Sequence, residues 1–461
     1  MAATQTADNR IKQPAAAKRQ GRKKFGIKID WMLLLATAVL LVFGLLMVYS
    51  ASSYNAQIKF GDSGWYLKKQ LTAAAIGAVG LIAATLIPYD FWKRKVTAFL
   101  FWISIVLLML VLSPIGIESY GAKRWIDIKV FTLQPSEVVK VGLILLMASI
   151  LYKYEKYLQN MLSFLLLSVP TLIAAGLCAI VTDDLGTAMV MFVMGIVMMF
   201  VTCPKKKYVV LLVAIIALLA VIMILSKSYR RLRIKAWLNV EAYADDEGYQ
   251  IMQGLYAIGS GGLFGKGIGK STQKMSFVPE CENDMIFSII CEELGIFGAV
   301  ILIAMIAILV WRLWVIYKQT EDKFGKLIIA GIMAHIAFQS FLNMGVVTSL
   351  LPNTGVPLPF ISYGGSSIIM LMIEIGLALS VSSGRTSQAG QQVMPVIEFT
   401  RKTTMFGMLL EIAANIPSLI RTKPAKPQKK KRPASSQPKN RSGNKRPVVR
   451  EDKSRGVIYY K

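Results

Sequence analysis

Long apolar runs alternate with shorter polar segments along most of this chain. About ten runs reach the roughly 17–25 residues that an α-helix needs to cross a bilayer. Backbone groups in hydrocarbon must hydrogen-bond within their own segment, so these runs must be helices, whereas a membrane β-barrel would show short alternating segments. We therefore predict an all-α polytopic membrane protein with about ten transmembrane helices, at about 31–51, 70–88, 96–112, 136–152, 162–181, 187–203, 208–226, 285–316, 327–349 and 364–383.

The composition agrees with this pattern. Of the 461 residues, 54% are hydrophobic and 17% are charged, whereas soluble domains carry about 25% charged residues. A soluble enzyme, a secreted disulfide scaffold and a disordered protein are therefore excluded. The run at 31–51 is too long for the apolar region of a signal peptide, so we interpret it as a retained span.

The formal net charge of +27 is concentrated at the two ends of the chain. About half of the 53 Lys and Arg residues lie in residues 1–30 and 385–461. Such tails could bind nucleic acid, but contact with anionic membrane lipids is the preferred interpretation, so we predict no nucleic-acid partner. Ten spans put both termini on one side, and the positive-inside rule makes both tails cytoplasmic. Within the second tail, residues 403–420 are typical of an interfacial helix.

Between the tails, residues 31–384 form the predicted membrane domain, with two long loops on its outer side. One loop covers 113–135. The other covers 227–284, between the seventh and eighth helices, and is nearly 60 residues long. A loop of this length is usually functional or disordered, and its many aromatic residues argue against disorder.

The first of these loops carries candidate ligands for a phosphate group. Lys123, Arg124 and Trp125 place two cations and an indole where a lipid head group would lie. Anchoring of Trp125 at the membrane interface is the competing explanation. Just beyond, Glu137 and Lys140 share a helix face at i,i+3, and either a local ion pair or a site would explain them.

Acidic residues near the ends of spans are further candidates. Asp183 and Asp184 lie between two spans and indicate either a site or a helix cap. Asp284 lies where the 227–284 loop meets an apolar helix, and partial desolvation there would raise its pKa and make it a better proton acceptor; a helix N-cap is the alternative. Glu292 and Glu293 lie inside a span and need polar partners.

The last outer loop, 352–367, contains three prolines and three glycines, which exclude a continuous helix. Irregular backbone near a membrane is tolerated where it is buried in protein or lines a cavity. His335, in the preceding span, is interpreted as a hydrogen-bonded structural residue. Glu374, in the last span, has no assigned role.

Taken together, these segments resemble the SEDS family (shape, elongation, division and sporulation) and its FtsW/SpoVE branch, over about residues 31–384. The most specific matches are 279–295 and 352–367, and 121–140 also matches. Asn353 resembles the division and sporulation branch rather than the RodA branch. The chain departs from the family where His-Thr-Asp is usual and Glu282-Asn283-Asp284 stands, and where Pro-Asp-Leu-Gly-Thr is replaced by Asp183-Asp184-Leu-Gly-Thr.

The resemblance implies the SEDS fold and the polymerisation of lipid II into the glycan strands of peptidoglycan, in cell division or sporulation. Asp284 aligns with the essential aspartate of the family. Inverting transfer from a polyprenyl-pyrophosphate donor needs one base and cations for the developing charge, and Asp284 fits the base. A divalent cation (Mg or Mn) could share the charge, although no dedicated metal cage is evident. The predicted substrate-binding residues are Lys123, Arg124, Trp125, Glu137, Lys140, Arg231, Lys274 and Ser362.

Two other functions compete with the polymerase. A lipid II flippase would also use broken helices and polar groups in the membrane, but it needs them along a full path, and here the motifs cluster on the outer side. A scaffold for division proteins would leave Asp284 unexplained. The family resemblance further implies a class B penicillin-binding protein as transpeptidase partner, contacts with other division proteins and membrane lipids, and an extracytoplasmic active site in the bacterial cell membrane.

Overall fold

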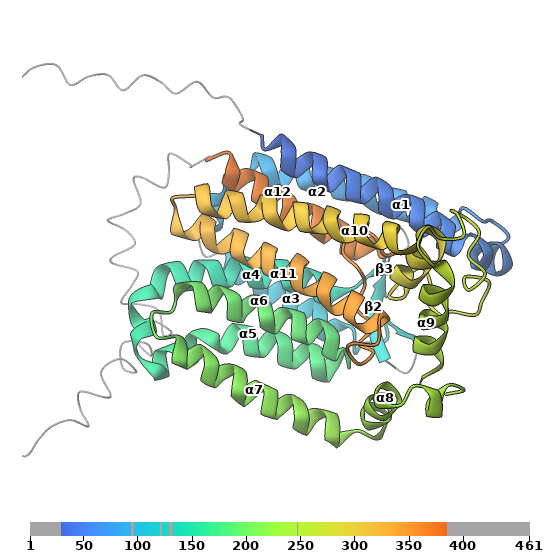
Figure 1. The fold of residues 1–461 in the computed structure, drawn as a ribbon. Coiled ribbons are helices and arrows are strands. Elements are labelled where there is room, and N and C mark those ends of the chain that lie inside the picture. Colours follow the sequence, from blue (N-terminus) through green and yellow to red (C-terminus); the bar gives the residue numbers. More distant parts are fainter. Residues whose placement is uncertain (1–28, 94–95, 120–121, 129–131, 247, 385–461) are drawn as a thin grey trace, which may run out of the picture. The chain divides into compact units, whose positions relative to one another are not determined.

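The computed structural model describes residues 29–384, apart from 94–95, 120–121, 129–131 and 247. Nearly all of the predicted tails, and the whole of the predicted helix at 403–420, therefore lie outside the described residues. The described part is a helical bundle with one small sheet (Figure 1). Its elements are α1 (Trp31–Phe60), α2 (Trp65–Leu86), η1 (Tyr89–Lys93), α3 (Val96–Leu110), β1 (Gly116–Ser119), β2 (Ala122–Asp127), β3 (Thr132–Leu133), α4 (Pro135–Tyr154), η2 (Glu155–Gln159), α5 (Met161–Val181), α6 (Leu185–Thr202), α7 (Lys206–Ser226), α8 (Ser228–Leu238), η3 (Glu241–Tyr243), α9 (Tyr249–Gly261), α10 (Ile286–Gln319), α11 (Lys323–Val347) and α12 (Gly365–Ser382).

The predicted apolar spans are present as helices. Within the described ranges, nine helices are long and apolar enough to cross a membrane. The remaining predicted span, 96–112, contains α3, whose 15 residues reach only about 22 Å against a hydrocarbon core of about 30 Å. The helical membrane fold is confirmed, with nine full-length spans and one shorter apolar helix in the described part of the chain.

The first helix is longer than its apolar run predicts. Asp30 caps the start of α1 by accepting a hydrogen bond from the Leu33 amide at 3.0 Å. The helix continues beyond residue 51 through a polar stretch and ends at Gly61, which has the left-handed conformation (φ 70°) usual at helix ends. Hydrophobicity marks where a helix can contact lipid and not where its hydrogen bonding stops.

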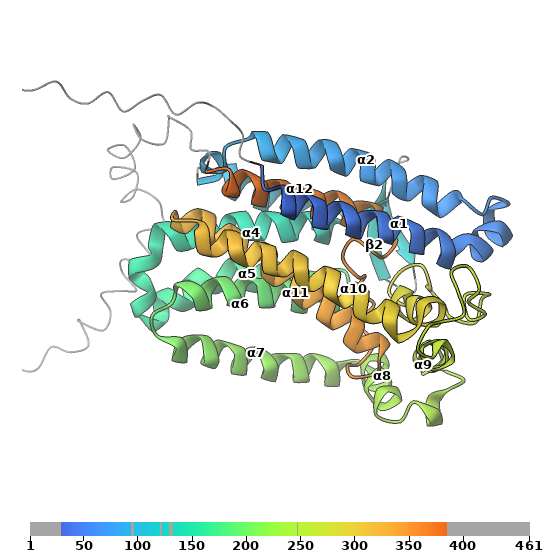
Figure 2. The ribbon, with the colours of Figure 1, turned by 45° about the horizontal axis from the view of Figure 1, so that its top comes forward.

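Burial separates central helices from peripheral ones. In the most apolar 18-residue stretch of each helix, 78% of the residues are buried in α4, 72% in α11 and 78% in α12, whereas only 11% are buried in α7. In α7 only Val209 and Leu212 are buried, and this helix runs along the edge of the bundle in both orientations (Figures 1 and 2). The apolar side chains of α7 therefore face outward, toward lipid in a membrane.

Gly295 interrupts α10, which sequence analysis predicted as one span at 285–316. Its backbone has φ 68° and ψ −165°, outside helical values. The amides after the break bond to the loop that follows α9, Ile296 to Gly262 at 3.0 Å and Phe297 to Leu263 at 3.2 Å. The single predicted span is thus two helical segments, because the loop supplies the hydrogen bonds that the helix gives up there.

A three-stranded antiparallel sheet, in the order β1-β2-β3, forms within the 113–135 loop. The prediction of purely helical structure missed it. Trp125 of β2 pairs with Ile117 of β1, and Ile126 pairs with Leu133 of β3. The strands are too short to give the alternating signal on which a strand prediction depends.

Replacing Gly295 by alanine should destabilise the protein. The new Cβ would lie 2.4 Å from the Leu263 carbonyl oxygen, and the positive φ is strained for any L-residue. We expect the free energy of unfolding to fall by about 1–3 kcal/mol, measured by thermal unfolding in detergent. Gly176→Ala in α5 is the control, since nothing lies within 4 Å of its added Cβ. Equal stability of the two variants would contradict the role given to Gly295.

Candidate active site

Asp284 lies at the junction between the long loop and α10. Its side chain is half-buried. The residue directly before the helix is Met285, and no side chain caps this helix start. The N-cap explanation for Asp284 is therefore wrong, and its carboxylate has other neighbours.

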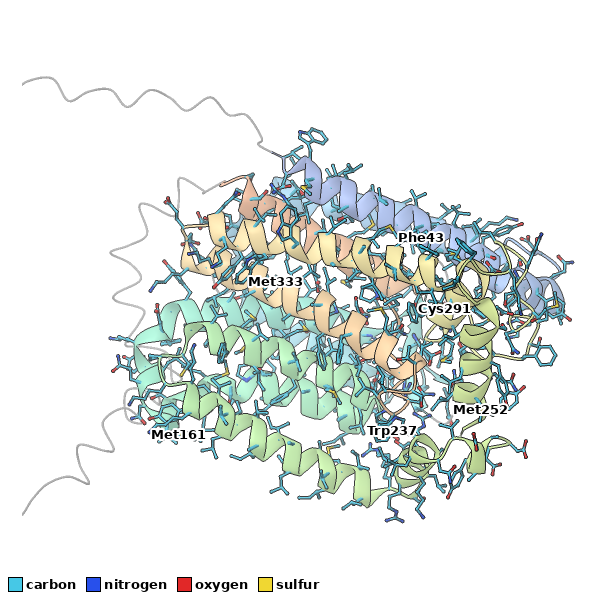
Figure 3. All side chains as sticks on the ribbon, in the orientation of Figure 1. Phe43, Met161, Trp237, Met252, Cys291 and Met333 are labelled. Carbon is cyan, nitrogen blue, oxygen red and sulfur yellow. The ribbon has the colours of Figure 1, made fainter. Side chains whose placement is uncertain are left out.

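Two segments distant in sequence flank this carboxylate. Gln250 of α9 donates from Nε2 to Oδ1 of Asp284 at 3.4 Å and accepts at Oε1 from Nδ2 of Asn353 at 2.8 Å. On the other side, a Cβ placed on Gly355 (φ 65°) would lie 3.7 Å from Oδ2 of Asp284. Helix α9 and the proline-rich loop before α12 thus enclose the carboxylate. Figure 3 shows Met252 of α9 and Trp237 of α8 at this same end of the bundle.

Burial and neighbouring charges together make Asp284 an unusually good proton acceptor. Burial raises its pKa to about 7, and the negative charges of Glu280 and Glu282 act in the same direction. A hydrogen bond to the backbone and the positive charge of Arg233 oppose this shift. Asp284 therefore changes protonation state near neutral pH, as a general base should.

A second cluster joins α8 to the α5–α6 junction. Arg230, buried on α8, forms an ion pair with Asp183, and Lys227 Nζ lies 3.0 Å from Asp183 Oδ2. Arg124 of β2 donates to the carbonyl oxygens of Thr182 and Asp183, both at 3.0 Å. Arg124 thus ties the sheet to this junction. Contact between Arg124 and a pyrophosphate stays a prediction.

The two adjacent aspartates at the α5–α6 junction have different roles. Asp184 caps α6, since its carboxylate accepts from the amide and the hydroxyl of Thr187 at 2.9 and 2.8 Å. Burial alone would raise the pKa of Asp183, but hydrogen bonds from Tyr229, Lys227 and Arg230 outweigh it and lower that pKa. Asp183 is therefore an ionised anchor for α8.

Two further arginines of α8 have different surroundings, and contact between Arg231 and a pyrophosphate stays a prediction. Arg231 is exposed, and its Nη1 donates to the Leu225 carbonyl at the end of α7 at 2.8 Å. Arg233 acts electrostatically on Asp284, and its guanidinium lies 5.9 Å from the ring of Tyr229. Sequence analysis did not single out Arg233; its spacing of three from the anchored Arg230, which places both on one helix face, was the available signal.

Glu292 and Glu293 have the polar partners that their position in a span requires. Lys274 Nζ lies 2.8 Å from Glu293 Oε1, with side chains 4% and 0% exposed, and Ser50 donates to the same carboxylate at 2.6 Å. Lys266 Nζ lies 2.6 Å from Glu292 Oε1. These contacts hold the glycine-rich part of the long loop against α10. Lys274 is therefore engaged in a buried ion pair, and its contact with substrate stays a prediction.

Several other predicted substrate-binding residues have partners within the protein. Glu137 and Lys140 form a 2.8 Å ion pair, and each side chain is 2% exposed. The hydroxyl of Ser362 is buried and accepts from the Leu358 amide at 2.7 Å. On β2, Trp125 pairs with Ile117 and Lys123 pairs with Glu118, so the register shifts at Arg124, as in a β-bulge.

No metal centre is evident among the residues that the structure describes. No group of three or more His, Cys, Asp or Glu side chains there is arranged to hold a metal ion. A pocket of about 720 Å³ is lined by residues that include Asp30, Arg312 and Glu321. The pocket lies near the last turns of α10, around Arg312 and Ile316, whereas Asp284 lies before the first turn of that helix, so the two are remote from each other.

Fold and site together define a multi-pass membrane protein whose polar site lies at one end of its helices. The sequence profile of the FtsW/RodA/SpoVE family, described as cell cycle proteins, matches residues 30–387. The chain belongs to this family, which confirms the SEDS resemblance.

Curated relatives and solved structures agree with this assignment. The chain is 39% identical over 366 residues to the probable peptidoglycan glycosyltransferase FtsW of Trichlorobacter lovleyi, covering 79% of this chain and 96% of the relative. It is 40% identical over 358 residues to stage V sporulation protein E of Bacillus subtilis, covering 77% and 96%.

Two solved structures have the same fold. One is described as "Structural coordination of polymerization and crosslinking by a peptidoglycan synthase complex"; it has a TM-score of 0.64 at 25% identity and covers 79% of this chain and 100% of that one. The rod shape determining protein RodA of Thermus thermophilus has a TM-score of 0.56 at 26% identity, covering 78% and 99%.

Replacement of Lys274 by methionine tests whether this lysine is structural. The change leaves Glu293 buried without its cation, and we expect a loss of about 3–5 kcal/mol in the free energy of unfolding. Adding Glu293→Gln removes the stranded charge and should restore most of the thermal stability in detergent. A double variant that is stable but has lost its activity would instead place Lys274 at the substrate.

Proposed function

We propose that this chain is a peptidoglycan glycosyltransferase that polymerises lipid II into glycan strands during cell division or sporulation. The observation that carries the proposal is Asp284, a half-buried carboxylate with a pKa raised to about 7, enclosed by α9 and the proline-rich loop. The names of the curated relatives in this family support the same reaction.

The chemistry follows from the donor. In lipid II the sugar is linked to a polyprenyl pyrophosphate, which is a good leaving group. The transfer reaction therefore needs no ATP. Asp284 accepts the proton of the acceptor's sugar hydroxyl, the hydroxyl oxygen forms a bond to the anomeric carbon, and the bond from that carbon to the pyrophosphate oxygen breaks. A single displacement inverts the anomeric carbon and requires no second nucleophilic carboxylate, in contrast to a retaining hydrolase.

Cations near the base would stabilise the departing pyrophosphate. Arg233 is the cation that acts on Asp284, and an arginine fork suits phosphate oxygens. Lys123 and Arg124 on β2 are further candidates. Gly355 exposes backbone beside Asp284, which leaves room for a sugar to approach the carboxylate.

We place this site on the outer side of the bacterial cell membrane. The excess of Lys and Arg in residues 1–30 and 385–461 favours a cytoplasmic location for both tails. With that orientation, the 227–284 loop and Asp284 face the periplasmic or external side, where lipid II is consumed.

A separate transpeptidase would complete wall synthesis. We propose a class B penicillin-binding protein, bound through transmembrane helices, because the similar solved structure is described as a complex that coordinates polymerization and crosslinking. Other division proteins and membrane lipids are the remaining proposed partners.

Lipid II transport is the alternative function. Buried polar residues on α4, α11 and α12 favour it, since a transporter needs polar groups within the membrane. These residues are paired with each other, however, as Glu137 with Lys140 and His335 with Glu374. Transport of fluorescent lipid II across proteoliposomes, in the absence of any polymer, would favour this alternative.

Asp284→Asn should abolish polymerisation while the protein still folds. The amide keeps the size of the side chain but cannot accept the proton of the attacking hydroxyl. We expect at least about a 100-fold loss of glycan formation from purified protein and lipid II, with unchanged thermal unfolding. Polymer yield equal to that of the wild type would remove Asp284 from the catalytic role.

The rate should also depend on pH near neutrality. Asp284 acts as a base only when deprotonated, and its pKa of about 7 implies that the rate rises with pH through this value and falls about tenfold per unit below it. Initial rates of lipid II consumption between about pH 5.5 and 9 measure this profile. An acid limb near the ordinary carboxylate pKa of about 4 would instead indicate a solvated side chain.

A further inference from the structure

Three polar side chains occur at intervals of four residues on α11: His335, Gln339 and Asn343. Residues four apart share one helix face, and all three side chains are buried, at 0%, 0% and 1% exposure. Asn343 donates from Nδ2 to the backbone carbonyls of Asp284 at 2.7 Å and Val356 at 2.8 Å. It therefore binds the candidate base and the proline-rich loop to one point on α11.

Gln339 makes the next contact with the same loop, one helical turn earlier. Its Nε2 donates to the Pro357 carbonyl at 2.9 Å. A carbonyl oxygen only accepts, so this bond determines which end of the amide is nitrogen. The other end, Oε1, accepts from Lys140 Nζ and from His335 Nε2, both at 2.9 Å.

Buried charges hold Gln339 in this orientation. Because Oε1 is an acceptor, Nε2 of His335 must carry a hydrogen, and Nδ1 faces both carboxylate oxygens of Glu374 at 3.0 and 2.8 Å. His335 is therefore held by Glu374 on the side away from Gln339. Lys140 is held by Glu137 at 2.8 Å. Two buried pairs thus fix one amide.

We infer that Gln339 is a positioning residue for the candidate base: it sets the proline-rich loop through Pro357, and the loop in turn sets Asp284. The loop acts on Asp284 in two ways. Asn353 holds Gln250 beside the carboxylate, and the backbone of Gly355 lies next to the same carboxylate. The hydrogen bonds of Gln339 go to Lys140, His335 and Pro357 and not to Asp284 itself. This inference rests on the proposed function, because it assigns a purpose to the placement of Asp284.

Gln339→Glu is the decisive variant. It keeps the size of the side chain and an oxygen for Lys140 and His335, but it removes the donor to Pro357 and sets two oxygens against each other. Gln339→Met removes the same donor without adding charge and is the second variant, should the first fail to fold. Ser340→Ala is the matched control, since Ser340 is equally buried and its hydroxyl bonds only within α11, to Ile336 at 2.7 Å.

Hydrogen–deuterium exchange and kinetics on purified protein test the inference together. For the Gln339 variants we expect faster exchange in residues 352–364, a kcat lowered about 10- to 100-fold, as expected for a misplaced reacting group, and a KM for lipid II within about twofold of the wild type. Ser340→Ala should match the wild type in both measurements. Exchange and kcat at wild-type values in a folded Gln339 variant, or equal losses in Ser340→Ala, would overturn the inference.

The exchange measurement needs no substrate and therefore separates the two proposals. A wild-type protein that forms no polymer contradicts the proposed function. Unchanged exchange in the proline-rich loop contradicts the role of Gln339, whatever the activity.

Discussion

The cost of leaving a charge unpaired inside a membrane protein is the constraint on which the rest of this structure depends. Glu292 and Glu293 lie in the first turns of α10 with no exposed surface. Both are neutralised by lysines of the preceding loop. That pairing holds the glycine-rich part of the loop against the helix, next to the break at Gly295.

The same constraint explains why the cations are spread over several elements. Arg230 is committed to Asp183, Lys140 to Glu137 and Lys274 to Glu293. Within each pair the two charges cancel, and the Arg230 and Lys274 pairs also join separate parts of the bundle. Asp284 differs, because its closest charged neighbours include further carboxylates and its pKa is raised rather than lowered. A structural carboxylate is stabilised in its ionised form; this one is prepared to accept a proton.

Rigid support for such a group comes from helices and not from the loops that surround it. Helix α11 is among the most buried elements. The side-chain amide of its Asn343 binds Asp284, and that of its Gln339 binds the proline-rich loop. Helix α9 provides Gln250 from the other side. A base that must meet a sugar hydroxyl within hydrogen-bond distance needs this kind of support, because errors of about 1 Å are costly for catalysis.

The sequence by itself determined the membrane class and the positions of most helices, and it made Asp284 a candidate, because apolar runs and a carboxylate at the end of one are local signals. It also indicated that Glu292 and Glu293 need partners, without identifying them. Only the tertiary structure decided that Lys274 pairs with Glu293, that Arg233 acts on Asp284, and that His335 contacts Glu374. Those outcomes depend on contacts between residues tens to hundreds of positions apart, and on the rotation of each helix about its axis, which no pattern along the chain records.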